Sequence, residues 1–558
     1  MHRRIVAILC VAAVTLPLAG CAPGAESPPG GARAVTPAPA ALTWADAGPY
    51  ELTEGTRIIV DGDAGTAPDL LADLLREATG HPVPVVDAST DGTVAAADAD
   101  DIAITVDPEA SAPVPEPAPA AGTGRDEAYA LETGADGVEL TARSAAGAFL
   151  GTQSLRQLLP AAIERPGADA PDGGWTVPAA SVADRPRFAY RGAMLDVARH
   201  FFPVEGVERY LDALALLKVN VLHLHLTDDQ GWRIAIDGWP ELTGIGASTS
   251  VGGDGGGSYS AEDYRRIVAY AAARHITIVP EIDLPGHTNA ALSAYPELNP
   301  GGVAPPPYEG FEVGFSSLSA APEEAEATNR FLADVLTQVA ALTPGPWLHV
   351  GGDESHATSE EDYLDLVGRI TATAAATGKT VMGWHELGAS GDLPEGTIGQ
   401  YWNFVEPEAE PEELAHSIVD QGGRLVLSPA DVAYLDMKYV DDPPSPQGRR
   451  VGLEWAKGAT TLDEAYSWEP TEILPGVDEA AILGIEAPLW TETLRDIDEV
   501  EFMAFPRIVA IAEIAWSPRP AGGERDHDGF FDRVALLGQR WDETGTAYHP
   551  VGGVPWVG

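Results

Sequence analysis

The sequence is short of cysteine and of basic residues. Only two cysteines, Cys10 and Cys21, occur in 558 residues. We expect Cys10 to leave with an N-terminal signal and Cys21 to carry lipid, so the mature chain has no disulfide and no thiol chemistry. The 33 lysines and arginines face 85 acidic residues, which gives a formal net charge of −52. Such a surface repels phosphate backbones and anionic headgroups, and this argues against nucleic acid as a partner.

The apolar run near the start of the chain is too short to span a membrane comfortably. It covers Ile5–Leu18 and follows two arginines, which is the form of an export signal. The sequence LAGC at 18–21 resembles the bacterial lipobox, which implies cleavage before Cys21 and lipidation of its thiol. Plain secretory cleavage near Ala22 is the alternative. Both interpretations predict an extracellular protein, either lipid-anchored to the outer face of the cytoplasmic membrane or secreted, with a lipid anchor as its only membrane contact.

Composition divides the rest of the chain into a tether and two folded units. The chain is too long for one ordinary domain, and its 45% hydrophobic residues suffice for a large core. After the signal peptide at 1–21, residues 22–40 are rich in Pro, Ala and Gly and indicate a flexible tether. Residues 41–184 predict a small, non-catalytic α+β domain. Its expected elements are strands at 57–60 and 102–106, helices at 69–78 and 145–159, and a hairpin at 129–142.

From residue 185 to residue 558 the pattern changes to strands followed by helices. Eight such strands with helices between them predict an α/β fold, a (β/α)8 TIM barrel that ends in a C-terminal helix. Ser260 and Asp263 form a plausible capping box at the start of one helix. The expected strands are 190–197, 219–226, 276–282, 347–350, 380–384, 397–402, 424–427 and 482–487.

The fourth of these strands leads directly into two acids. Apolar residues from Trp347 run into two glycines and then into Asp353 and Glu354. Barrel active sites lie at the carboxyl ends of the strands, so these acids are expected to meet ligand. Neighbouring side chains on an extended chain point in opposite directions. The two carboxylates are therefore expected to do different jobs, addressing two parts of one substrate if the strand end turns.

Polar and aromatic residues follow the other strands as well. Few of them are cationic and several are aromatic, which suits a neutral, polyhydroxylated ligand stacked on rings. The site therefore resembles a sugar pocket. The candidates are Asp196, Arg199, His200, Asp228, Arg233, Glu281, Asp283, His287, Trp384, His385, Glu386, Trp402, Tyr434, Asp436, Trp490 and Glu492.

Several of these stretches together resemble glycoside hydrolase family 20, the β-N-acetylhexosaminidases. The resemblance covers the whole barrel in the expected order, and residues 41–184 resemble the non-catalytic domain that precedes the barrel in that family. The stretches are GAMLDVARH at 192–200, HLTDDQGWR at 225–233, PEIDLPGH at 280–287, HVGGDE at 349–354 and WTE at 490–492.

The resemblance implies a retaining, substrate-assisted reaction without a cofactor. This family is an exception to the usual pair of enzymic carboxylates, because the 2-acetamido oxygen of the substrate is the nucleophile. Glu354 would protonate the leaving oxygen and later deprotonate water. Asp353 would hold the acetamido N–H and stabilise the oxazolinium intermediate.

The resemblance also assigns binding roles. Arg199, Asp436 and Glu492 would bind hydroxyls of the terminal sugar, which favours exo-cleavage of terminal GlcNAc or GalNAc from N-acetylhexosamine-terminated oligosaccharides such as chitin fragments. Asp228 and His287 would position Glu354 and tune its proton affinity. The acetamido group and sugar ring would be walled by Trp384, Trp402 and Trp490, with Tyr434 donating to the acetamido oxygen.

Three alternatives stay open. His223 and His225 face the same way on a strand and could be metal ligands, although no further His or Cys spacing completes a zinc site, so we favour a hydrogen-bond network and no metal. Trp455 and Trp468 compete as the platform for the leaving group, with Trp455 preferred. A lipid-anchored amino-sugar-binding protein without catalysis is the competing function, and the intact pair of acids argues against it.

Overall fold

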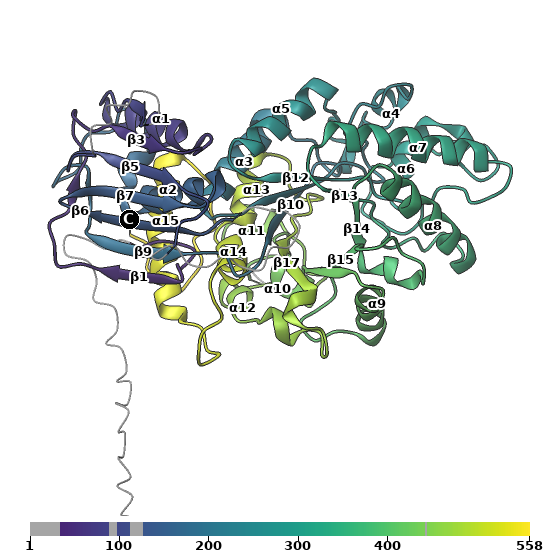
Figure 1. Cartoon of the computed structure of the whole chain (residues 1–558). Coiled ribbons are helices and arrows are strands. Elements are labelled where there is room, and N and C mark those ends of the chain that lie inside the picture. Colours follow the sequence, from purple (N-terminus) through teal and green to yellow (C-terminus); the bar gives the residue numbers. More distant parts are fainter. Residues whose placement is uncertain (1–33, 89–96, 112–125, 441–442, 558) are drawn as a thin grey trace, which may run out of the picture.

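The computed structural model describes residues 34–88, 97–111, 126–440 and 443–557. Cys21 and the expected signal and lipobox lie outside these residues. Figure 1 shows a sheet domain in purple and blue beside a larger barrel in teal and green, with the yellow C-terminal helix against the sheet domain. Within the described residues, no helix is both long and apolar enough to cross a bilayer.

The first domain is a seven-stranded mixed sheet in the order β1-β9-β6-β7-β5-β3-β4. Helices α1 (Ala67–Thr79) and α2 (Ala145–Leu158) pack on it, and α1 ends at Gly80 in the left-handed conformation. The expected helices and hairpin are present, but strands β1, β4 and β9 of this sheet and the separate two-stranded sheet of β2 and β8 were not expected. The strands of this domain are β1 Ala41–Trp44, β2 Tyr50–Glu51, β3 Ile58–Asp61, β4 Val85–Asp87, β5 Ile102–Val106, β6 Tyr129–Gly134, β7 Gly137–Ala142, β8 Thr176–Val177 and β9 Ala180–Asp184.

Eight parallel strands close the barrel, which confirms the predicted fold class. Their residues are buried almost without exception, because helices cover the outside and side chains fill the inside. Three strands have the expected bounds, and the other five are shorter than expected by one or two residues at one or both ends. The strands are β10 Tyr190–Asp196, β11 Val221–His225, β12 Thr277–Glu281, β13 Trp347–His349, β14 Thr380–Trp384, β15 Ile398–Tyr401, β16 Arg424–Leu427 and β17 Ile482–Ala487.

Helices and shorter helical turns connect the barrel strands (Figure 1). The expected capping box is present at the start of α5, where Ser260 and Asp263 satisfy each other's backbone N–H groups. The helices after the first domain are α3 Val204–Leu216, α4 Glu241–Gly244, α5 Ala261–Ala272, α6 Asn289–Ala294, α7 Ala325–Leu342, α8 Glu360–Ala376, α9 Ala409–Asp420, α10 Ala430–Ala433, α11 Pro446–Arg450, α12 Leu462–Tyr466, α13 Ile497–Ala504, α14 Arg507–Trp516 and α15 His527–Thr544.

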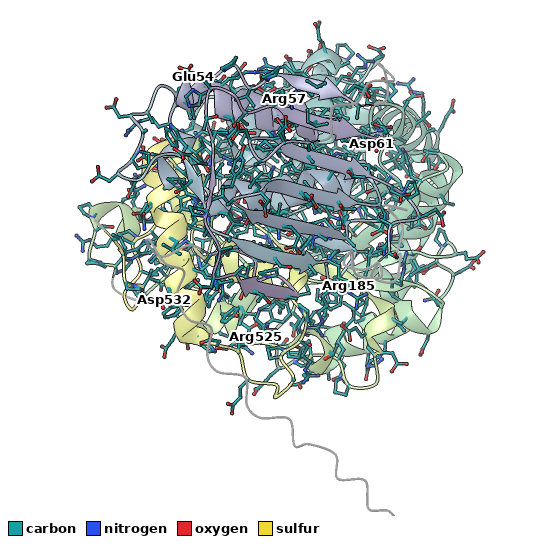
Figure 2. All side chains as sticks on the ribbon, turned by 60° about the vertical axis from the view of Figure 1, so that its left-hand side comes forward. Glu54, Arg57, Asp61, Arg185, Arg525 and Asp532 are labelled. Atoms are coloured by element: carbon teal, nitrogen blue, oxygen red, sulfur yellow. The ribbon has the colours of Figure 1, made fainter. Side chains whose placement is uncertain are left out.

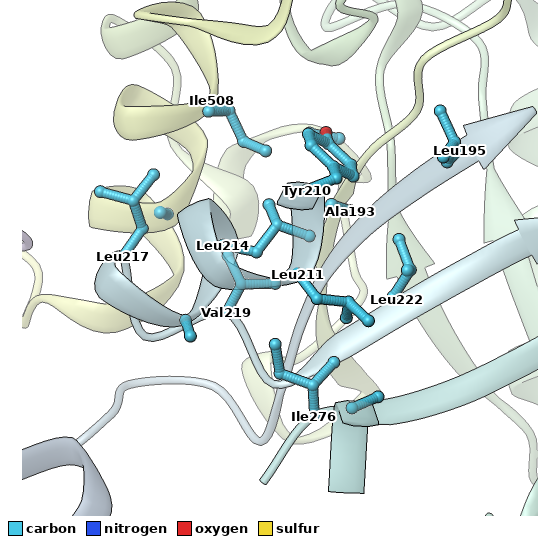
Figure 3. Close-up of a cluster of buried hydrophobic side chains, with 14 of the residues drawn as sticks. Ala193, Leu195, Tyr210, Leu211, Leu214, Leu217, Val219, Leu222, Ile276 and Ile508 are labelled. Carbon is cyan, nitrogen blue, oxygen red and sulfur yellow. The ribbon is translucent and has the colours of Figure 1, made fainter. Parts of the chain in front are cut away.

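Figure 3 shows how one helix covers the barrel wall. Tyr210, Leu211 and Leu214 recur at helical spacing on α3 and point toward the strands β10 and β11. All three are fully buried, and burying each such side chain is worth about 1.5–3 kcal/mol. The apolar spacing of the sequence thus fixes which face of α3 meets the barrel.

Buried ion pairs join the two domains. Lys218, which follows α3, donates to Asp184 at 2.8 Å and to the Tyr129 hydroxyl at 2.9 Å. Arg191 on β10 pairs with Glu127 of the first domain at 2.8 Å. These charges are buried almost completely, so the paired geometry is needed to offset their desolvation. The barrel is thereby held in one orientation on the sheet domain.

Candidate active site

The carboxyl ends of the barrel strands open into a cavity of about 510 Å³. This cavity collects nine of the eleven residues to which the resemblance assigns a role, from seven different strand ends. Its predicted lining residues are Arg199, His287, Asp353, Glu354, Trp384, Trp402, Tyr434, Trp490 and Glu492. Asp228 and Asp436 are buried behind this lining.

Asp353 and Glu354 face the same side chain. Asp353 Oδ2 lies 3.5 Å and Glu354 Oε2 lies 3.4 Å from Nε2 of His287. The alternation of side chains along a strand therefore does not apply to this pair, and the turn of the strand end that we left open is present. The reason is that β13 ends at His349, and the chain then turns with positive φ angles at both glycines and at Glu354. The two acids sit on a tight turn rather than on a strand.

His287 links this pair to a buried acid behind it. Its Nδ1 lies 3.2 Å from Asp228, which also accepts from Arg199 and from His225 at 2.8 Å each. Burial alone would lower the pKa of His287, but Asp228 and Asp353 raise it well above its ordinary value. Burial would raise the pKa of Asp228, yet Arg199 and His287 lower it below its usual range. The imidazole is therefore held as a cation against the acid pair.

Aromatic rings form the wall of the cavity. The rings of Trp384 and Trp490 lie 5.9 Å apart, and Tyr434 lies 6.3 Å from Trp490. The indole N–H of Trp384 donates to Glu281 at 2.9 Å, and that of Trp402 donates to Glu386 at 2.9 Å. Because the polar edges of these two indoles are bound to carboxylates, buried Glu281 and half-buried Glu386, their positions are fixed.

A second acidic group lies at the closed end of the cavity. Both carboxylate oxygens of Asp436 and one of Glu492 are buried without a hydrogen-bond partner among the described residues. Burial raises the pKa of Asp436 well above its ordinary value, and the charge of Glu492 raises it further. Arg199 lies beside them, over the ring of Trp490. Free acceptors beside a guanidinium are suited to bind the hydroxyl groups of a sugar.

Trp455 lies at the mouth of the cavity. Its ring is 47% exposed and stands 6.1 Å from Trp402 and 5.6 Å from Tyr434. Trp468 is buried, and its N–H is bound to a backbone carbonyl within the same turn. Of the two competing platforms, the structure places Trp455 at the site.

The sequence did not single out four other lining residues: Phe311, Val313, Leu453 and Glu454. They come from irregular segments rather than from strand ends. The available signal was the exposed aromatic character of the proline-rich loop around Phe311, which stands 56% exposed.

His223 and His225 lie below the cavity in a hydrogen-bond network, as we expected. Both nitrogens of each ring face a carboxylate of Glu281, Glu486 or Asp228 at 2.5–3.1 Å. Groups such as His223, Glu281 and His349 are close enough to share an ion. Glu281 already accepts hydrogen bonds from His225 and from the indole N–H of Trp384, whereas Nε2 of His223 and Nε2 of His349 have no hydrogen-bond partner among the described residues.

The closed barrel, the acid pair at a strand end and the aromatic-walled cavity define a (β/α)8 glycoside hydrolase. Comparison with known proteins confirms this and shows that the chain belongs to glycosyl hydrolase family 20. The model of the family's catalytic domain matches residues 188–363 and 357–519, and that of its domain 2 matches residues 32–185.

The relatives are similar over nearly the whole chain. A β-N-acetylhexosaminidase of Cellulomonas fimi is 41% identical over 94% of this chain and 97% of its own. A family 20 β-N-acetylhexosaminidase structure from Streptomyces coelicolor superposes with a TM-score of 0.84 at 45% identity, covering 94% of this chain and 98% of its own. A mutant Streptomyces plicatus β-hexosaminidase in complex with its product GlcNAc superposes with a TM-score of 0.83 at 44% identity, covering 94% of this chain and 97% of its own.

Proposed function

We propose that the chain is an exo-acting β-N-acetylhexosaminidase, which removes terminal β-linked GlcNAc or GalNAc with retention of configuration. The observation that carries this proposal is the turn at the end of β13, which holds two carboxylates on one side of an aromatic-walled cavity. Neither carboxylate needs to be the nucleophile, because the 2-acetamido group of the substrate supplies it. Relatives named β-N-acetylhexosaminidase support the same activity.

Glu354 carries the proton in both steps. In the first step it donates a proton to the glycosidic oxygen while the acetamido carbonyl oxygen attacks the anomeric carbon, and the aglycone leaves as an alcohol. In the second step Glu354 takes a proton from water, which attacks the anomeric carbon and opens the oxazolinium ring. His287, held as a cation by Asp228, keeps the Glu354 carboxyl in place.

Asp353 orients and stabilises the acetamido group of the substrate. Its carboxylate accepts the acetamido N–H, turns the carbonyl oxygen toward the anomeric carbon and balances the positive charge of the oxazolinium. Holding the nucleophile within the substrate makes attack intramolecular, a kind of arrangement that can be worth roughly 7–11 kcal/mol of barrier. Trp384, Trp402 and Trp490 enclose the acetamido methyl and the ring, and Tyr434 donates to the acetamido oxygen.

The closed end of the cavity explains why cleavage is exo. Asp436 and Glu492 accept from hydroxyls of the terminal sugar and Arg199 donates to such hydroxyls, which supports recognition of the non-reducing end. Trp455 at the open mouth stacks against the leaving sugar. N-acetylhexosamine-terminated oligosaccharides, including chitin fragments, fit this arrangement.

A binding protein without catalysis is not favoured. A binder has no need of a carboxyl group at the glycosidic oxygen, nor of a charged histidine that orients it.

We further propose that the enzyme is exported and anchored by lipid at Cys21. The LAGC sequence after a short apolar run supports this. Replacing Cys21 by serine should release the protein from the membrane fraction into the medium and abolish incorporation of labelled fatty acid. Retention of the label by Cys21→Ser would refute the anchor.

The activity is tested with chromogenic sugars. We expect rapid turnover of an N-acetyl-β-glucosaminide, release of the β-anomer as the first product by NMR, and nearly no turnover of the plain β-glucoside. The reason is that the plain glucoside lacks the nucleophile. No turnover of the first substrate at any pH would refute the activity, whereas rapid cleavage of the glucoside would point to an enzymic nucleophile.

A further inference from the structure

A row of buried carboxylates and histidines runs from the middle of the barrel to the acid pair. His223 lies 3.0 Å from Glu486 and 3.1 Å from Glu281, through different ring nitrogens. His225 likewise lies 2.5 Å from Glu281 and 2.8 Å from Asp228. An imidazole with a carboxylate at each nitrogen carries both protons. Negative and positive charges therefore alternate along the row Glu486, His223, Glu281, His225, Asp228 and His287, and His287 faces Glu354.

Glu281 is the branch point of this row. It is fully buried at the end of β12 and is not among the residues that line the cavity. Its Oε2 faces His223 and His225. The other ring nitrogen of His225 contacts Asp228. Its Oε1 accepts from the indole N–H of Trp384 at 2.9 Å and lies 2.8 Å from His349. Hydrogen bonds from His225 and Trp384, together with His223 and His349 within 3.1 Å, leave the carboxylate with a single orientation.

We propose that Glu281 is a positioning residue that couples the two halves of the reaction. It fixes the plane of Trp384 behind the acetamido group and, through His225 and Asp228, orients His287 against Glu354. The inference rests on the proposed function of this cavity and adds to it a residue that does not touch the substrate.

The charges around the row agree with this role. Burial by itself would raise the pKa of Glu281, but the three facing histidines hold it well below its ordinary range. Burial would lower the pKa of His223, yet Glu486 and Glu281 raise it to about 9. The remaining titratable or charged groups that face the row are Tyr190 on β10, Arg199 after β10, Asp229 after β11, Asp283 after β12, Asp353 after β13 and Glu386 after β14.

The test is the isosteric variant Glu281→Gln, for which two properties are measured: the pH profile of kcat/KM and the selectivity for the acyl group. Loss of a buried negative charge eases loss of the proton from Glu354, so the alkaline limb of kcat/KM should move to lower pH by roughly half a unit or more. Loss of the carboxylate also frees Trp384, so selectivity for an N-acetyl over an N-butanoyl substrate should fall roughly 10-fold. A purely structural role would change neither property once the variant is folded.

Glu486→Gln is the matched control. It removes the same charge from the same row, but Glu486 lies one histidine farther from the site and its hydrogen bonds go to His223, Tyr190 and Gln400. We expect a smaller shift of the alkaline limb and wild-type acyl selectivity. Equal behaviour of the two variants would overturn the proposal.

Two further variants keep the test decisive if Glu281→Gln does not fold. Trp384→Phe removes the indole N–H and should relax acyl selectivity without moving the alkaline limb. His225→Gln removes a buried cation and should move that limb to higher pH without relaxing selectivity. Wild-type behaviour of either variant overturns the proposal. Absence of turnover by the wild type would instead refute the proposed function, so the two failures are distinguishable.

Discussion

At the scale of single residues, Glu354 offers the most direct test of the chemistry. Its carboxyl lies 28% exposed at the cavity, within 3.4 Å of His287. Replacement by glutamine removes the transferable proton, so kcat on chitobiose should fall roughly 10²–10⁴-fold. A dinitrophenyl glycoside has a good leaving group and should lose far less in its first step. Equal losses on both substrates would contradict the acid role.

Replacing Asp353 by asparagine should lower kcat with a different dependence on the leaving group. Asparagine keeps the size of the side chain but cannot balance the oxazolinium charge, so kcat should fall roughly 10²–10³-fold for good and poor leaving groups alike. Thermal unfolding should stay close to that of the wild type, because Asp353 is turned toward the cavity and one of its oxygens lacks a hydrogen-bond partner in the described structure. Near-normal activity would remove Asp353 from the mechanism.

The residues of the site differ in how well sequence predicts them. Those at a strand end or a few residues after it, such as Trp384 and Trp490, were placed because barrel topology brings the carboxyl end of every strand to one face. Phe311 and Val313 were missed because they lie on a long loop without regular structure, whose path depends on packing and not on local pattern. The branch at Glu281 was also missed, since only the folded barrel shows that one carboxylate meets three histidines.

At the scale of elements, the strands were predicted well and the turn after β13 was not. Continuous apolar runs identify buried parallel strands, and all eight were found. The side-chain alternation of a strand applies only while the strand lasts, and β13 ends four residues before Asp353. In the first domain, β1 and β4 are short edge strands, with too few residues for a clear periodic signal.

Gly351 tests how much the reaction depends on that turn. Its φ angle is +70°, and a Cβ added there would lie 1.7 Å from a carboxylate oxygen of Asp283. Gly351→Ala must therefore displace Asp283 and the turn itself. We expect the free energy of unfolding to fall by about 3 kcal/mol and kcat/KM to fall at least 100-fold, measured by denaturant unfolding and by initial rates.

Gly378, in the turn between α8 and β14, provides the matched control. It has a similar φ angle of +83°, but a Cβ there would meet nothing within 4 Å. Gly378→Ala should cost only about 1 kcal/mol of backbone strain and leave kcat/KM unchanged. If both variants lost activity alike, the geometry of the β13 turn would not be the cause.

At the scale of the whole molecule, acidic groups dominate the surface, and the buried cations where the two domains meet are paired. Glu54, Asp61 and Asp532, which are labelled in Figure 2, are exposed examples. The net charge of −52 favours solubility and repels anionic partners, but it says nothing about the chemistry. The cations that matter for architecture, such as Lys218 and Arg191, are buried where the domains meet. Sequence pattern could not pair them, because their partners lie in another domain.

The C-terminal helix α15 was expected to pack on the barrel, and its Arg540 also reaches the first domain. Arg540 donates to Glu164 at 2.7 Å and to the backbone carbonyls of Gln157 and Leu159, at the end of α2. Arg540, on a helix that follows the barrel, therefore caps the C-terminal end of α2 in the first domain. The side chain is only 6% exposed, so water cannot replace these bonds easily.

Removing this contact should weaken the union of the two domains. In Arg540→Leu, two buried carbonyls lose a donor and Glu164 keeps only Arg156 as its cationic partner. We expect the free energy of unfolding to fall by about 3 kcal/mol and the calorimetric transition to broaden or split, because the first domain can then unfold ahead of the barrel. The matched control is Arg165→Leu. This variant breaks an ion pair between Arg165 of the first domain, which is 55% exposed, and Glu543 on the same helix α15. An exposed pair contributes about 0–1 kcal/mol, so equal effects of the two variants would show that the buried cap does not hold the domains together.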